Sequence, residues 1–280
     1  MALDRKKLGK RALTALFGMV ALGILILLLP KWSFHLALIG FGFVGILEFE
    51  QMAKALDLRL FRWPILLVLV WGVGSLYVPW MKLSWLPYLG CAATVLVSIL
   101  PHQSVTSSLQ QVGITLTAGI YLSLTFIPIA YIFAIEDGSG ERVGRMLTTF
   151  CILMVWGGDS LAYLAGSLFG KQKIAPSISP NKTYAGTAAN LLGNFAVLLI
   201  AKYSWIPQLT LADCLVLALV FGILGFSGDL VESSWKRATR IKDSGRLFPG
   251  HGGIMDRIDS FFLTAPIFYF YMKAWVLGLS

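Results

Sequence analysis

The residues best suited to chemistry begin inside a long apolar run near the C-terminal third of the chain. Asp229 lies within that run, and Glu232, Ser233 and Lys236 follow it at i+3, i+4 and i+7. On a helix these side chains share one face. The spacing therefore predicts a polar stripe that leads out of an apolar helix and into the basic segment that follows it.

The segment 233–260 combines basic residues, acids and closely spaced glycines. Asp256 and Asp259 are spaced i,i+3, so they would project from one side of a helix. Paired carboxylates beside several lysines and arginines suit a polyphosphate that carries a hard cation. Gly252 and Gly253 fit the same ligand, because glycine allows positive φ and a close approach of backbone N–H groups to an anion.

A plainer interpretation of this segment is a basic cytoplasmic loop with glycine-rich turns. It explains the lysines and arginines, but it does not explain the acids or the turn around His251. His251 could act as a general base, or it could only hydrogen-bond a phosphate or cap the turn. Both roles stay open from the sequence.

A second polar segment, 170–186, contains prolines that interrupt helix on both sides of Ile178. It offers hydroxyl, amide and ammonium donors near the start of a predicted helix, which is a natural anion site. The donors are Ser179, Asn181, Lys182 and Thr183. The chain has no GxxxxGK[ST] sequence, so an ordinary P-loop is excluded.

The composition is that of a membrane protein, with 57% hydrophobic and 13% charged residues. A soluble domain typically has about 25% charged residues. We predict a single all-α polytopic membrane domain over 1–280, with about nine transmembrane helices. The predicted spans are 12–29, 33–48, 64–80, 84–101, 113–135, 147–169, 187–201, 211–232 and 261–279.

The distribution of basic residues sets the expected orientation. With the N-terminus in the cytoplasm, most lysines and arginines fall in cytoplasmic segments, as the positive-inside rule requires. The C-terminus is then outside, and the segments 170–186 and 233–260 share the cytoplasmic side. We expect 1–150 to be a scaffold with lipid or dimer contacts and 151–280 to be the catalytic part. His35 has no polar neighbours in the sequence, so we expect it at the membrane interface.

These motifs resemble the signature of the phosphatidate cytidylyltransferases, also called CDP-diacylglycerol synthases. The match covers about 155–260 with fixed spacing, and Trp235 stands where the family more often has an aliphatic residue, Met or Phe. The residues that carry it are Ser233-Ser234-Trp235-Lys236-Arg237, Lys242-Asp243-Ser244-Gly245, Phe248-Pro249-Gly250-His251-Gly252-Gly253-Ile254-Met255-Asp256-Arg257-Ile258-Asp259, and upstream Asp159-Ser160-Leu161-Ala162-Tyr163 and Ser179-Pro180-Asn181-Lys182-Thr183.

The resemblance implies a reaction in which CTP and phosphatidate give CDP-diacylglycerol and pyrophosphate, with Mg²⁺ required and a second cation left open. It implies Asp229 and Asp256 as metal ligands, with Asp259 next. We expect catalytic roles for Asp229, Asp256, Lys242 and Arg257. The expected substrate contacts are Asp159, Ser179, Asn181, Lys182, Thr183, Ser233, Lys236, Arg237, Asp243, Arg246, His251, Gly252 and Gly253.

The expected partners are CTP, phosphatidate and bilayer lipids, with no nucleic acid and with a homodimer left open. The expected location is the inner (plasma) membrane, with the site facing the cytoplasm. Two other functions stay in view. A cation-coupled transporter would also use acids within membrane helices, and a CTP-dependent polyprenol kinase would transfer the γ-phosphate and release CDP.

Overall fold

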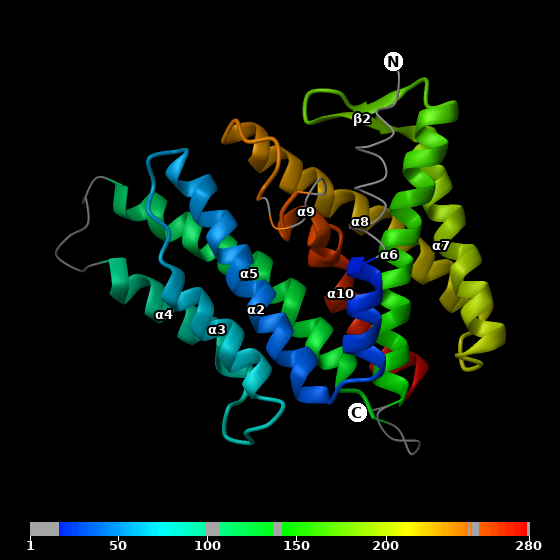
Figure 1. Ribbon diagram of the computed structural model, residues 1–280, viewed down its shortest axis with the longest axis horizontal. Coiled ribbons are helices and arrows are strands. Elements are labelled where there is room, and N and C mark those ends of the chain that lie inside the picture. Colours follow the sequence, from blue (N-terminus) through cyan, green and yellow to red (C-terminus); the bar gives the residue numbers. More distant parts are fainter. Residues whose placement is uncertain (1–16, 99–106, 137–141, 246, 248–251, 279–280) are drawn as a thin grey trace. The chain divides into compact units, whose positions relative to one another are not determined.

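A computed structural model describes residues 17–98, 107–136, 142–245, 247 and 252–278 (Figure 1). The chain forms two compact units. The first unit contains Met1–Ala130 and the returning segment Ala238–Arg257, and the second contains Tyr131–Arg237 and Ile258–Ser280. The segment that follows the polar stripe therefore packs with the N-terminal helices, far from it in sequence.

The first unit is built from apolar helices. A short helix, Phe17–Leu27, precedes them. α2 packs against α3, α3 packs against α4, and the short helix α9 belongs to the returning segment. The elements are α2 (Lys31–Lys54), α3 (Arg62–Gly74), the 3₁₀ turn η1 (Leu83–Trp85), α4 (Leu86–Ser98), α5 (Ser108–Phe133), which ends just past the unit boundary, and α9 (Met255–Ile258).

The second unit is centred on two long helices that lie side by side, α6 (Arg142–Phe169) and α7 (Tyr184–Ser204). The strands β1 (Lys173–Ala175) and β2 (Ser179–Thr183) connect them as an antiparallel hairpin at one end of the pair (Figure 1). The unit also contains α8 (Leu211–Ala238), α10 (Phe261–Phe270) and the π-helical segment η3 (Tyr271–Val276).

The helical membrane architecture predicted from the composition is supported by the described residues, among which five helices are long and apolar enough to cross a bilayer. They are α2, α5, α6, α7 and α8. Four shorter apolar helices coincide with the other predicted spans: Phe17–Leu27, Arg62–Gly74, Leu83–Ser98 and Phe261–Val276. The count of nine crossings and the orientation of the termini stay predictions.

Two local features were not predicted from the sequence. The segment between α6 and α7, where prolines were predicted to interrupt helix, forms a β-hairpin, with Pro176 in its turn and Pro180 on β2. His35 is buried within the protein, at 2% exposure, and its predicted place at the membrane interface stays a prediction. Its ring nitrogens lie 2.5 Å from the Tyr77 hydroxyl and 3.1 Å from the Ala130 carbonyl, partners that are distant in sequence.

The start of α7 is fixed by its cap and by a close approach to α6. Thr183 has extended backbone angles, and its hydroxyl accepts a hydrogen bond of 3.1 Å from the Gly186 N–H. A Cβ atom at Gly186 would lie 2.7 Å from the backbone oxygen of Ala162. The absence of a side chain at Gly186 therefore sets the spacing between α6 and α7, and with it the place of the hairpin.

We predict that Gly186→Ala destabilises the protein by about 1–3 kcal/mol, because a backbone oxygen cannot move away as a side chain could. The measurement is the thermal unfolding midpoint in detergent. Gly157→Ala on α6 is the matched control, since a Cβ there has no neighbour within 4 Å. An equal midpoint for the two variants would show that the helices are not held this closely.

Candidate active site

An ion pair between β2 and α8 is the centre of the candidate site in the second unit. The Lys182 ammonium lies 2.5 Å from Asp229 Oδ2, and the two side chains are 18% and 30% exposed. The same ammonium lies 4.4 Å from the centre of the Phe226 ring, one turn before Asp229. The structure thus brings together two predicted site residues that come from separate predicted segments.

The polar stripe on α8 has the predicted i,i+4 contacts. The Ser233 hydroxyl donates to Asp229 Oδ1 at 3.1 Å. Lys236 Nζ lies 2.5 Å from Glu232 Oε2, and the Glu232 side chain is fully buried. Each acid of the stripe is therefore paired with a basic side chain, which offsets the cost of placing carboxylates on an apolar helix.

Further carboxylates gather around this stripe. Asp259 lies in the turn between α9 and α10 and accepts a hydrogen bond of 2.7 Å from the Ser260 N–H. Removal from water raises the pKa of the Asp259 carboxyl well above its usual value, and the nearby carboxylates of Asp229, Glu232 and Asp159 raise it further. This mutual repulsion is the electrostatic condition under which a bound cation is stabilising.

Within the described part of the chain, no group of three or more His, Cys, Asp or Glu side chains is arranged to hold a metal ion by itself. That finding is compatible with Mg²⁺, which commonly binds one or two carboxylates and takes its other ligands from water and substrate phosphates. The carboxylate oxygens of Asp229 and Asp259 are of the right chemical kind. The predicted Mg²⁺ site stays a prediction.

In the first unit, a buried glutamate on α2 holds the returning segment. Glu48 is 3% exposed. Its Oε1 accepts from the Ile254 N–H at 2.8 Å, and its Oε2 accepts from the Met255 N–H at 2.9 Å. The Ser244 hydroxyl lies 2.8 Å from Oε2. The carboxylate of one apolar helix thus contacts both ends of the segment Ser244–Met255.

Asp256 holds the same segment from within. Its Oδ2 accepts from the Gly253 N–H at 2.9 Å and the Ser244 N–H at 3.0 Å, and it lies 2.9 Å from the Ser244 hydroxyl. Gly252 has a φ of +82°, which favours glycine. The anion that the glycine-rich backbone approaches in this structure is therefore the protein's own carboxylate, and the predicted phosphate contacts of Gly252 and Gly253 stay untested.

The remaining predicted residues divide by exposure. Thr183 is buried and its hydroxyl caps α7. Arg237 is exposed and its Nε donates to the Ile178 carbonyl in the hairpin turn at 3.3 Å. Ser179 is partly buried on β2. The exposed members are Asp159, Asn181, Lys242, Asp243 and Arg257. Arg246 and His251 lie outside the described residues.

Comparison with known proteins identifies the family. The model of the cytidylyltransferase family matches residues 9–275. The chain belongs to the cytidylyltransferase family. It is 30% identical over 270 residues to a protein of Bacillus subtilis named phosphatidate cytidylyltransferase, which covers 93% of this chain and 96% of that protein. It is 31% identical to a protein of the same name from Staphylococcus aureus over 259 residues, with 92% and 96% covered.

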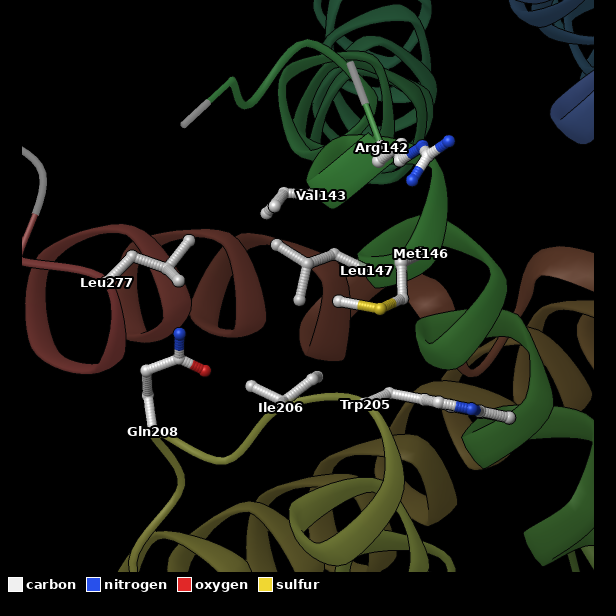
Figure 2. A pocket seen from close by; sticks show the side chains of 8 residues that line it. All are labelled: Arg142, Val143, Met146, Leu147, Trp205, Ile206, Gln208 and Leu277. Atoms are coloured by element: carbon white, nitrogen blue, oxygen red, sulfur yellow. The ribbon is translucent and has the colours of Figure 1, made fainter. Parts of the chain in front are cut away.

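These similarities indicate that the chain is a nucleotidyltransferase. The end of α8 carries Lys236 and Arg237, and the β-hairpin carries Lys173 and Lys182. A cavity of about 250 Å³ lies at the end of α6 and α7 that is far from the β-hairpin (Figure 2). The first turns of α6 and the turn after α7 line it. Its lining is mostly apolar, and the Arg142 guanidinium points away from the other side chains there (Figure 2).

Two contributors to the arrangement were missed from the sequence. Phe226 was passed over as one more apolar residue of α8, although its position three before Asp229 places it on the same helix face. Glu48 ends a predicted membrane span, and Glu50 follows it, so the pair resembled acids at a membrane surface. The sequence did distinguish the two acids. Glu50 has a basic partner at i+4, Lys54, whereas Glu48 has no basic residue at i±3 or i±4, which indicates that its partner comes from elsewhere in the chain.

We predict that Gly253→Ala destabilises the first unit by about 1–3 kcal/mol, because a Cβ there would lie 2.2 and 2.4 Å from the two Glu48 oxygens. Gly40→Ala on α2 is the control, since a Cβ at Gly40 has no neighbour within 4 Å. Thermal unfolding in detergent measures both variants. A Gly253→Ala protein as stable as Gly40→Ala would contradict the described contact with Glu48.

Proposed function

We propose that this cytidylyltransferase makes CDP-diacylglycerol from CTP and phosphatidate, with release of pyrophosphate. The observation that carries the proposal is the Lys182–Asp229 ion pair among further carboxylates, in a chain that aligns with nearly the whole length of relatives named phosphatidate cytidylyltransferase. Basic and acidic side chains from the hairpin and α8 then serve one reaction between two phosphate-bearing substrates.

The reaction demands charge stabilisation more than proton transfer. A phosphate oxygen of phosphatidate attacks the α-phosphorus of CTP, the bond from that phosphorus to the bridging oxygen breaks, and pyrophosphate leaves with the electron pair. The attacking oxygen is already anionic, so no general base is needed. Basic side chains placed where negative charge accumulates on the phosphates lower the barrier. Lys182, Lys236 and Arg237 are candidates in the second unit, and Lys242 and Arg257 in the first.

Mg²⁺ is the cation proposed for the site, and Asp229 and Asp259, both in the second unit, are the residues proposed to hold it. The role of metal ligand that the resemblance implies for Asp256 stays a prediction. When bound, Mg²⁺ neutralises charge on the phosphates and on the departing pyrophosphate. Lys182 neutralises Asp229 in the protein alone, and the same ammonium has the chemistry to contact a CTP phosphate when that carboxylate binds a cation. Asp159 and Glu232 contribute negative potential around Asp259.

The membrane setting suits these substrates. Phosphatidate keeps two acyl chains in the lipid, whereas CTP is dissolved in the cytosol, so the site must be open to both phases. The basic residues of both polar segments favour the cytoplasmic side. We therefore place the reaction at the cytoplasmic face of the plasma membrane, in phospholipid biosynthesis.

We predict that purified protein in detergent micelles releases pyrophosphate only when CTP, phosphatidate and Mg²⁺ are all present. Asp229→Asn is expected to lower kcat at least about 100-fold, because it removes a charge that a divalent ion requires. Asp57→Asn is the matched control, since Asp57 is an exposed turn residue with φ of +56° that asparagine tolerates.

CDP as the released nucleotide would support the polyprenol kinase instead. No release of pyrophosphate or CDP under any combination would leave a transporter as the better account. Asp229→Asn activity equal to that of the Asp57→Asn control would remove Asp229 from the proposed metal ligands.

We predict that Lys182→Met lowers kcat/KM for CTP by about 10- to 100-fold, the range expected when a charge-assisted contact to phosphate is removed. Lys173→Met is the control from the same hairpin, where Lys173 is exposed and pairs across the sheet with Thr183. Steady-state kinetics at varied CTP measure both. Indistinguishable kinetics for the two variants would assign Lys182 a structural role only.

A further inference from the structure

The hydrogen bonds of Glu48 connect helix α2, in the N-terminal half of the chain, with the returning segment. Glu48 is far in sequence from its hydrogen-bond partners; Ile254, for example, is 206 positions away. The Glu48 carboxylate accepts hydrogen bonds from three groups of the returning segment: the Ile254 and Met255 N–H groups and the Ser244 hydroxyl. A glutamate so placed on an apolar helix costs desolvation free energy, and these donors offset that cost.

One hydroxyl connects Glu48 to Asp256. The Ser244 Oγ lies 2.8 Å from Glu48 Oε2 and 2.9 Å from Asp256 Oδ2, and it has a single proton to donate. The two carboxylates therefore share one donor. A shift of either carboxylate changes the bond available to the other, so the position of Asp256 depends on Glu48.

Two glycines bring the backbone of the returning segment close to the Glu48 carboxylate. A Cβ at Gly245 would lie 2.3 Å from Oε1, and a Cβ at Gly253 would lie 2.2 Å from the same atom. Both glycines lie within the segment that Glu48 binds, next to Ser244 and Ile254. The glycines therefore let the backbone close tightly around this carboxylate.

The residues proposed to act on the phosphates project from the backbone that is fixed in this way. Lys242 and Asp243 directly precede Ser244, and Arg257 directly follows Asp256. All three are exposed, whereas Ser244 and Met255 are buried. The buried contacts hold the backbone, and the charged side chains at its two ends face outward.

We infer that Glu48 is a positioning residue for cytidylyl transfer, because its carboxylate clamps Ser244, Ile254 and Met255 and thereby places Asp256, Lys242 and Arg257. Glu48 touches no substrate in this inference, and it acts through the segment it holds. The inference rests on the proposed function for its catalytic consequence. The clamp itself is independent of any substrate, so it can be measured separately.

The first experiment is hydrogen exchange of the backbone amides of Gly253, Ile254 and Met255 in the full chain in detergent, without substrates. Glu48→Gln keeps the size of the side chain but replaces one acceptor oxygen by an N–H₂ group, which faces donors. We expect exchange at these amides to be at least about tenfold faster than in the wild type. Glu50→Gln is the matched control, since Glu50 lies on the same helix in an i,i+4 ion pair with Lys54 at 3.0 Å.

The second experiment measures pyrophosphate release by the same variants. Glu48→Gln is expected to lower kcat by about 10- to 100-fold while the KM for CTP changes much less, because misplaced groups affect the transition state more than binding. Glu48→Asp, which restores both acceptor oxygens on a shorter arm, is expected to recover part of the loss. Ser244→Ala breaks the clamp from the other side and is expected to lower kcat in the same direction, so the inference stays testable even if Glu48→Gln does not fold.

The outcomes separate this inference from the proposed function. If the wild-type protein releases no pyrophosphate, the proposed function is contradicted, and hydrogen exchange still tests the Glu48 clamp by itself. Exchange in Glu48→Gln equal to that in Glu50→Gln would overturn the clamp. Faster exchange with an unchanged kcat would overturn the positioning role, as would a lower thermal midpoint with full activity per folded molecule.

Discussion

A carboxylate on an apolar helix must find donors, and this requirement organises both units of the structure. Asp229 pairs with Lys182 from the hairpin, Glu232 pairs with Lys236 one turn along the same helix, and Glu48 takes backbone N–H groups from a distant segment. In a low-dielectric environment an unpaired carboxylate has a high desolvation free energy, so each of these acids is stable only where another segment supplies it with donors. The acids thus connect segments that the sequence separates.

The same requirement accounts for the glycines of the motif. Backbone N–H groups can reach a carboxylate closely only where no side chain intervenes, and a Cβ at Gly253 would lie within 2.4 Å of both Glu48 oxygens. Gly252 adds a positive φ beside Asp256. The glycine-rich motif is in this structure a device for binding internal carboxylates. The charged side chains of Lys242 and Arg257, on either side of this motif, are exposed.

Local chemistry in the sequence predicted some of these features well. The spacing of Asp229, Ser233 and Lys236 predicted the stripe on α8, because helical periodicity is a local property. The pairing of Lys182 with Asp229 joins segments 47 positions apart, and no periodicity encodes it. The polar partners of His35 were not predicted for the same reason, since Tyr77 and Ala130 are brought to it only by packing. The partners of Glu48 were missed because two of its three donors are backbone N–H groups 206 and 207 positions away, which the sequence does not mark.

The central claim is that these carboxylates and lysines serve transfer of a cytidylyl group to a lipid phosphate. The most direct measurement follows two preparations of CTP, one radiolabelled at the α-phosphate and one at the γ-phosphate, incubated with the protein, phosphatidate and Mg²⁺ and then extracted with organic solvent. The account predicts that the α-label enters the lipid phase and that the γ-label stays in water as pyrophosphate. A γ-label in the lipid phase, or an α-label that stays in water, would contradict it.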